Sequence, residues 1–128
     1  MNLSEAFALY GAEVPRRASR LSAFAADGAL IVGCSARRFS RPAAGVMRYE
    51  NVLSGDGGGT AEALLQLKQH LELAHKESRP VRLVIITESA SGATPTRTVH
   101  VRRDLVGSVL EFDGDRYVID FVRAGESR

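Results

Sequence analysis

The sequence of 128 residues contains no tryptophan, and it has a single cysteine, Cys34. One cysteine cannot form a disulfide within the chain, which excludes a disulfide-stapled fold and makes the cytoplasm, a reducing compartment, the expected location. No apolar run approaches the roughly 20 residues of a membrane span, and the first residues lack the basic and apolar regions of a signal peptide. We therefore expect no association with a membrane.

The composition is that of a soluble globular protein, with 45% hydrophobic and 25% charged residues. A chain of this length forms one ordinary domain and buries about two thirds of the surface that its unfolded form exposes. The sequence thus predicts a single domain over residues 1–128 that needs no structural metal.

Positive charge is concentrated in one part of the sequence. Between Val14 and Arg48 there is one acidic residue, Asp27, against seven arginines, at positions 16, 17, 20, 37, 38, 41 and 48. This segment carries a net charge of +6, whereas the rest of the chain carries −4. A basic face on an otherwise acidic domain is the footprint of a protein that binds a polyanion.

Two helices are expected. Thr60 is placed to cap the stronger one, at about 61–77, whose apolar residues recur at three- and four-residue steps, namely Leu64, Leu67, Leu71 and Ala74. A short N-terminal helix at about 5–10 would be capped by Ser4 and would turn Leu9 inward.

Strand patterns account for much of the remainder. The segment 81–87 is almost continuously apolar, as in a central strand buried on both faces. Asp27-Gly28 is a two-residue turn sequence with positive φ, and Asp113-Gly114-Asp115 is a second turn, so each joins two strands as a hairpin. The predicted strands lie near 19–25, 29–34, 46–53, 81–87, 98–102, 108–112 and 116–122.

Several segments read as loops. We expect flexible loops at 54–59 and 88–97, a ragged edge containing Pro42 at 35–45, and a short frayed tail at 124–128. The helix and strand patterns together predict the α+β class. The expected architecture is a mainly antiparallel twisted sheet of five to seven strands with one long helix (about 61–77) and a short N-terminal helix (about 5–10).

Residues that often carry catalysis or bind metals form no recognisable arrangement. Cys34 ends an apolar strand, where a small buried residue is usual, and an enzyme would need it to face a cleft within reach of a histidine. His70 and His75 are five residues apart, which separates them around a helix. The Gly-rich segment 55–59 lacks the lysine of a phosphate-binding P-loop, and the acids of the last hairpin lack the Glu-x-Lys of a nuclease. We expect no metal, no cofactor and a non-catalytic protein.

The segment Arg37-Arg38-Phe39-Ser40-Arg41 is the strongest candidate for a ligand site. Three guanidinium groups can contact phosphates while the ring of Phe39 stacks on an unpaired base. The first hairpin would bring three further arginines towards it. The sequence thus predicts a non-catalytic binding module for an anionic partner such as DNA or RNA, with contacts from Arg16, Arg17, Arg20, Arg37, Arg38, Phe39 and Arg41.

Two other interpretations stay open. The arginines can be solvated or paired with Glu13, Glu50 or the C-terminal acids, with Phe39 turned into the core. Alternatively, the chain can be a protein–protein interaction module or accessory subunit that uses a free sheet edge or the loop 88–97, without nucleic-acid contact. The sequence does not determine the oligomeric state.

Several short stretches, taken together, resemble a family of small uncharacterised bacterial proteins. The stretches are Tyr10-Gly11-Ala12, Asp27-Gly28, Met47-Arg48-Tyr49-Glu50, Val81 to Ile86, Arg103-Asp104-Leu105-Val106-Gly107 and Glu111-Phe112-Asp113-Gly114-Asp115. The resemblance spans most of the chain and implies a standalone bacterial domain of unassigned activity. It implies no catalytic residue.

Overall fold

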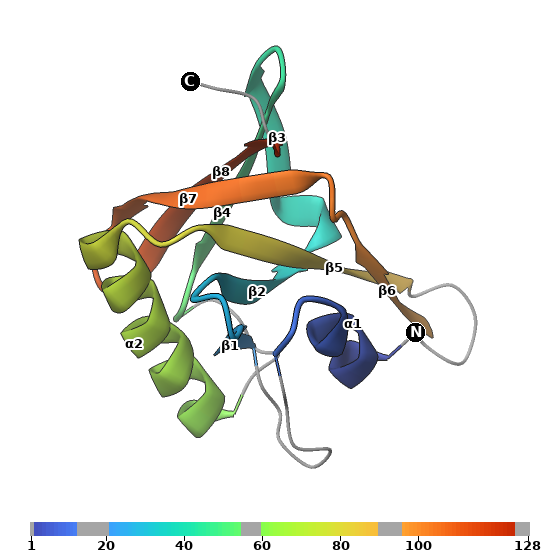
Figure 1. Cartoon of the computed structure of the whole chain (residues 1–128), viewed down its shortest axis with the longest axis horizontal. Coiled ribbons are helices and arrows are strands. Elements are labelled where there is room, and N and C mark those ends of the chain that lie inside the picture. Colours follow the sequence, from blue (N-terminus) through green and yellow to red (C-terminus); the bar gives the residue numbers. More distant parts are fainter. Residues whose placement is uncertain (1, 13–20, 55–59, 90–95, 125–128) are drawn as a thin grey trace.

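The computed structural model describes residues 2–12, 21–54, 60–89 and 96–124. The predicted α+β class is confirmed, because the described part forms a single domain with a mostly antiparallel open sheet of eight strands and two α-helices (Figure 1). The strand beyond the expected five to seven lies in the segment predicted as a ragged edge. The elements are α1 (Leu3–Leu9), β1 (Ser22–Phe24), β2 (Leu30–Ser35), the 3-10 helix η1 (Ala36–Arg38), β3 (Phe39–Ala43), β4 (Val46–Val52), α2 (Ala61–Glu77), β5 (Val81–Ser89), β6 (Thr96–Val101), β7 (Leu105–Phe112) and β8 (Arg116–Arg123).

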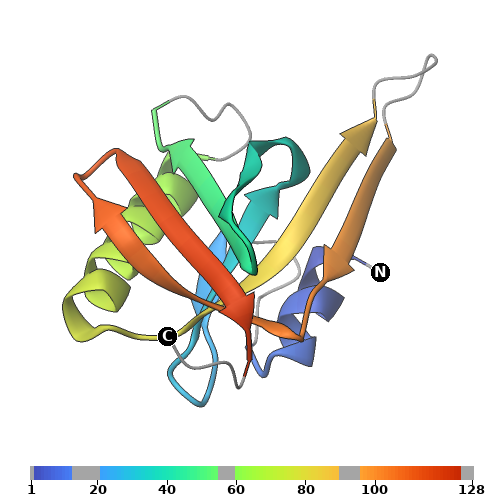
Figure 2. The same cartoon turned by 90° about the horizontal axis from the view of Figure 1, so that it is seen from above.

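The sheet is ordered β1-β2-β5-β7-β8-β4-β3, and β6 pairs with β5 beside this path. The central position predicted for 81–87 is confirmed: β2 runs parallel to β5 along one edge, while β6 and β7 share the other edge in antiparallel pairing. β3 continues from β2 through η1, yet it pairs with β4. The sheet therefore curls without closing, and the β3–β4 hairpin stands beside β5 (Figure 2).

α2 covers one face of the sheet and builds the larger core. Its bounds and cap are as predicted, with the Thr60 hydroxyl accepting a hydrogen bond from the amide of Ala63 at 3.1 Å. Leu67, Leu71 and Ala74 of the predicted stripe are buried, and Leu64 is partly buried. Each fully buried leucine contributes about 2 kcal/mol of hydrophobic stabilisation. The sheet residues of this core include Leu30, Val32, Tyr49, Leu83, Leu105, Val109, Tyr117, Ile119 and Phe121.

α1 covers the opposite face of β2 and β5, where Phe7 packs in a smaller core with Ile31 and Val84. Two details of the predicted helix are wrong. Asn2, not Ser4, is the cap: its side chain accepts from the Glu5 amide at 2.8 Å, and the Glu5 carboxylate accepts from the Asn2 amide at 2.9 Å. Leu9 is 42% exposed, because Phe7 takes the inward position.

Both predicted hairpins form, but only the second has the predicted turn. In the first, Gly28 has a φ of +91° but Asp27 does not have a positive φ, so the two-residue turn is wrong. The amide of Ala25 donates to the carbonyl of Ala29 at 2.9 Å, and Asp27 accepts from the Ala29 amide, which makes a wider turn. The Asp113-Gly114-Asp115 turn is confirmed, with Gly114 at φ +102°.

The loop expected at 88–97 is shorter than predicted. Glu88 still belongs to β5 and pairs with Arg97 of β6, since regular pairing between the two strands extends to the ends of both. Most of the loop at 54–59 and of the tail at 124–128 lies outside the described residues. Within the described ranges, no helix is long and apolar enough to cross a membrane.

Candidate functional site

The segment 36–43 is held in place by the core behind it. The amide of Ser35, at the end of β2, donates to the Tyr49 hydroxyl at 3.0 Å, and the amide group of Asn51 donates to the same oxygen at 3.0 Å. Burial raises the pKa of Tyr49 to about 12, so this phenol stays neutral. The anchored strand end fixes where η1 begins.

The alternation of β3 decides which of its side chains can act together. Ser40 pairs in register with Arg48 of β4, and Phe39 pairs with Tyr49, so Phe39 and Arg41 lie on the same face of the strand. The ring centroids of Phe39 and Tyr49 lie 5.0 Å apart. Phe39 is therefore partly turned into the core, as one of the alternative interpretations held.

The structure describes four of the seven predicted site residues. Arg37 and Arg38 are exposed on η1, Arg41 is exposed on β3, and Phe39 is half-buried. Within the described part of the chain, none of these arginines forms an ion pair, and Glu50 pairs with Arg116 instead of with them. The other three predicted residues, Arg16, Arg17 and Arg20, lie outside the described residues.

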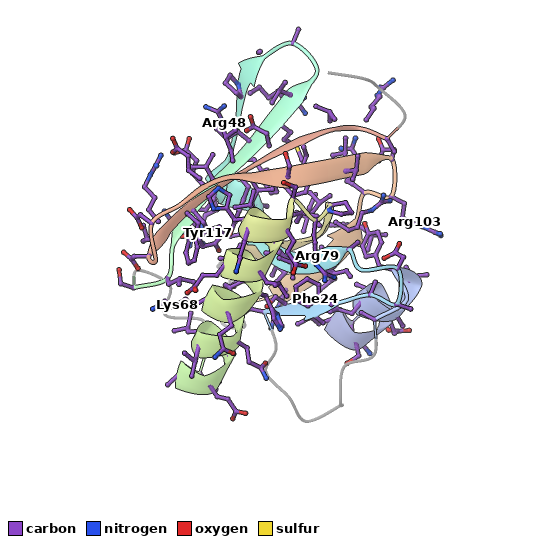
Figure 3. The ribbon with its side chains drawn as sticks, turned by 60° about the vertical axis from the view of Figure 1, so that its left-hand side comes forward. Phe24, Arg48, Lys68, Arg79, Arg103 and Tyr117 are labelled. Carbon is purple, nitrogen blue, oxygen red and sulfur yellow. The ribbon has the colours of Figure 1, made fainter. Side chains whose placement is uncertain are left out.

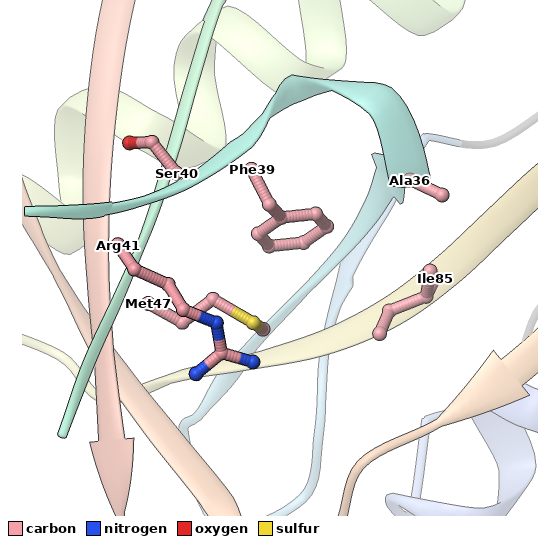
Figure 4. Close-up of a pocket in the computed structure, with 6 residues that line it drawn as sticks. All are labelled: Ala36, Phe39, Ser40, Arg41, Met47 and Ile85. Carbon is pink, nitrogen blue, oxygen red and sulfur yellow. The ribbon is translucent and has the colours of Figure 1, made fainter.

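Phe39 and Arg41 line an apolar pocket of about 270 Å³, together with Ala36, Ser40, Met47 and Ile85. The pocket lies where the sheet fails to close, with β3 and β4 on one side and β5 on the other. Figure 4 shows the ring of Phe39 facing Ile85, and the guanidinium of Arg41 beside the Met47 side chain. An aromatic ring and aliphatic side chains can pack against a flat, uncharged ring of a ligand. The cation at the margin can bind a negatively charged group attached to that ring.

A second cavity, the arginine pocket, adjoins the first. It measures about 330 Å³ and shares Arg41 and Met47 with the apolar pocket. The remaining lining residues are Gly45, Arg102, Leu105, Phe121 and Arg123. Arg102 and Arg123 were not among the predicted site residues, because only the folding of β6, β7 and β8 brings them to Arg41.

The charges of the arginine pocket are only partly compensated. Arg102 donates to both carboxylate oxygens of Asp104, at 3.0 and 2.9 Å. Hydrogen bonding to Arg102 lowers the pKa of Asp104, so the pair stays ionised. Neither Arg41 nor Arg123 forms an ion pair with any described residue. Among the described residues, these three guanidiniums and the one carboxylate paired with them leave two positive charges in excess.

Cys34 does not meet the condition that an enzyme would require. Its side chain is fully buried, its thiol contacts the carbonyl of Val32 at 3.6 Å, and burial raises its pKa far above the ordinary value. Its predicted character as a small buried residue is confirmed, and a buried neutral thiol is a poor nucleophile.

One of the two histidines of the long helix, His70, has a structural contact. His70 Nδ1 lies 2.8 Å from the hydroxyl of Ser22, and its ring meets that of Phe24 edge-on at 4.8 Å. A serine beside a histidine is the arrangement of a nucleophile and its base, but Ser22 is 1% exposed and no substrate reaches it. This pair joins β1 to α2.

The acids of the last hairpin serve the fold. Asp113 accepts from the amides of Asp115 and Arg116, and these bonds lower its pKa. Asp115 accepts from the amide and the hydroxyl of Ser54 at 2.7 and 2.9 Å. No group of three potential metal ligands occurs among the residues that the structure describes.

Comparison with protein-family models, with curated proteins and with solved structures gave no match to this chain. The candidate site is thus defined by its geometry and charge alone.

Proposed function

We propose that this protein binds single-stranded nucleic acid at the opening between β3 and β5, as a non-catalytic module. The observation that carries the proposal is the position of Phe39 in the apolar pocket, with Arg41 at its margin and Arg37 and Arg38 exposed on the adjoining η1. An aromatic side chain flanked by uncompensated arginines is the usual means of holding an unpaired base and its phosphates.

Each residue has a distinct role in this proposal. The exposed guanidiniums of Arg37 and Arg38 contact backbone phosphates, and Arg41 contacts the phosphate next to the base held by Phe39. The apolar pocket measures about 270 Å³ and lies between Phe39 and Ile85, and in this proposal it holds the flat face of one unpaired base. A cytoplasmic location fits this role and the free thiol of Cys34.

Fluorescence anisotropy with labelled single- and double-stranded DNA and RNA tests the proposal at roughly 50 and 200 mM salt. Binding to single strands is expected to weaken steeply with salt. The R37A/R38A/R41A variant should lower affinity at least tenfold and reduce the slope of log affinity against log salt by about 2, at roughly 0.7 per phosphate contact on a single strand. Unchanged affinity in this variant would refute the proposal.

A matched control separates local contacts from general charge. The R37A/R38A variant and the K68A/K76A variant each remove two positive charges from exposed side chains. Lys68 lies on α2, apart from the β3–β4 hairpin (Figure 3). The first variant should weaken binding far more than the second. Equal losses would mean that only net charge attracts the nucleic acid.

Phe39 is tested by a substitution that keeps its packing on Tyr49. The F39L variant fills most of the same volume but cannot stack on a base, so affinity for single strands should fall about tenfold while the melting temperature changes little. Equal affinity of wild type and F39L would remove the stacking role.

A second candidate function, protein–protein interaction, is favoured by the free edge of β6. β6 pairs with β5 along one edge, and its other edge has no strand partner among the described residues. A partner strand can add to such an edge through main-chain hydrogen bonds. This function predicts a self-association or pull-down signal that the R37A/R38A/R41A variant leaves unchanged, measurable by light scattering or co-purification.

A further inference from the structure

The arginine pocket differs from the neighbouring arginines of η1 in bringing side chains from distant parts of the chain around one cavity. All five arginines are exposed, but Arg37 and Arg38 are neighbours on η1, whereas Arg41, Arg102 and Arg123 line one cavity of about 330 Å³. They come from three separate parts of the chain: β3, the turn after β6 and the end of β8. Binding along a nucleic-acid strand needs cations spaced along the path of its backbone. Cations gathered around one cavity instead suit a single, strongly charged group.

We propose that the arginine pocket binds a terminal phosphate, so that the protein recognises the phosphorylated end of a nucleic-acid strand. This inference rests on the proposed function. An internal phosphodiester carries one negative charge, whereas a terminal phosphate monoester carries about −1.5 to −2 at pH 7 and presents three oxygens. The two positive charges of the pocket that no described carboxylate pairs with match the terminal group.

The pocket is built on a rigid frame. Leu105 pairs with Arg123 across β7 and β8, and its amide donates to the carbonyl of Arg102 at 3.1 Å. The amide of Ala124 donates to the carbonyl of Asp104 at 2.7 Å, which ties the end of β8 to the β6–β7 turn. The backbones of Arg102 and Arg123 are thereby fixed relative to each other, and Asp104 also orients the Arg102 side chain, which reduces the entropy lost on binding.

The neighbouring apolar pocket decides what kind of phosphate ester fits. Both pockets include Arg41 and Met47, so a phosphate in the arginine pocket lies next to the space beside Phe39. A terminal nucleotide fills both spaces at once, with its phosphate among the arginines and its base against the ring. Inorganic phosphate fills only the first.

The experiment compares one labelled oligonucleotide sequence in four forms: with a 5′ phosphate, with a 3′ phosphate, with hydroxyl groups at both ends, and as a closed circle. Anisotropy should show about tenfold tighter binding of one phosphorylated form than of the hydroxyl form and the circle. Equal affinity of all four forms would overturn this inference and leave the proposed function intact. Absence of binding in every form would instead refute the proposed function.

A variant and a competitor complete the test. The R123Q variant keeps a side chain of similar length, and it should bind the phosphorylated strand only as well as the hydroxyl form. The R37A/R38A variant should weaken both forms by the same factor and keep the tenfold preference. Inorganic phosphate should displace the phosphorylated strand only at far higher concentration than a nucleoside monophosphate does. Equal competition by the two would overturn the inference and indicate an adventitious ion only.

Discussion

The two faces of the β3–β4 hairpin carry arginines in opposite electrostatic situations. On one face, Arg48 donates to both carboxylate oxygens of Asp120 on β8, at 2.7 and 3.0 Å, and Asp120 is 4% exposed. On the other face, Met47 adjoins Arg41, which forms no ion pair within the described residues. The hairpin thus separates an arginine whose charge is paired within the fold from one that forms no ion pair among the described residues.

The face of β4 that carries Arg48 and Glu50 is a network of ion pairs. Arg116 donates to Glu50 at 2.6 Å and to Glu111 at 3.2 Å, beside the Arg48–Asp120 pair. The hydrogen bonds to Asp120 raise the pKa of Arg48, and those to Glu50 and Glu111 raise the pKa of Arg116. The contrast teaches that arginine content alone does not identify a binding surface. The acids that the sheet places opposite each arginine decide its role, and substitutions on the two faces should therefore have separable effects.

The largest effect is expected from reversing the charge that both pockets share. The R41E variant places a carboxylate beside Arg102 and Arg123, where it neutralises part of their charge and repels the phosphates of the ligand. Affinity for single-stranded nucleic acid should therefore fall about a hundredfold. Because Arg41 is exposed, the melting temperature should stay within a few degrees of wild type. Anisotropy and thermal unfolding measure the two quantities, and strong binding by a folded R41E protein would break the comparison.

The buried phenol behind the site gives the next largest effect. The pKa of Tyr49 in the folded protein, about 12, lies above its ordinary value of 10.0, so tyrosinate forms more readily in the unfolded chain. The contribution of Tyr49 to stability is therefore full below about pH 10 and should decrease by up to about 2 kcal/mol as the pH rises towards 12.

Denaturant midpoints for wild type and the Y49F variant at several alkaline pH values measure this effect. The Y49F variant should be less stable at neutral pH, since Ser35 and Asn51 lose their acceptor, and its stability should fall less between pH 10 and 12. Parallel pH profiles for the two proteins would show that Tyr49 does not titrate as described.

Loss of the paired carboxylate should reduce stability without affecting binding. In the D120N variant, one oxygen and one amide group replace the two acceptors of Arg48, so the buried bidentate pair is broken. We expect the melting temperature to fall by roughly 5 °C and the affinity for nucleic acid to stay unchanged. A loss of affinity in a folded D120N protein would show that the two faces are coupled.

The smallest effect on stability and binding is expected from the exposed ion pairs of Arg116. Arg116 and its partners Glu50 and Glu111 are largely solvent-accessible, with side-chain exposures of 48%, 42% and 64%. Exposed ion pairs contribute little because water and salt screen them. The R116A variant should therefore match wild type in both thermal unfolding and anisotropy, and a change in either would place Arg116 with the functional arginines.

Local patterns were enough to predict the elements that depend on neighbours in sequence. The bounds of α2 and its Thr60 cap are correct, since an apolar stripe and a capping hydroxyl are short-range signals. The position of β5 also followed from its composition. The start of α1 was missed because Asn2 and Ser4 both satisfy the capping preference, and only the packing of Phe7 selects between them.

The candidate site could be predicted only in part. Phe39 and Arg41 stand two residues apart, so strand alternation places them together, and the sequence segment drew attention to both. Arg102 and Arg123 stand more than sixty residues away in sequence, and their position depends on the pairing of β7 with β8. Such pairings are set by the whole sheet, and no local pattern in the sequence reports them.

The edge strand that carries the site also bears on how the protein behaves at high concentration. β3 is the last strand of the sheet order; it contains Pro42, and its register with β4 shifts between Ser40 and Ala43. A proline has no amide hydrogen to donate, and an irregular strand offers a poor template for another copy of the chain. The β3 edge can therefore stay exposed without seeding aggregation. Restoring a donor there with P42T should make concentrated solutions scatter more light.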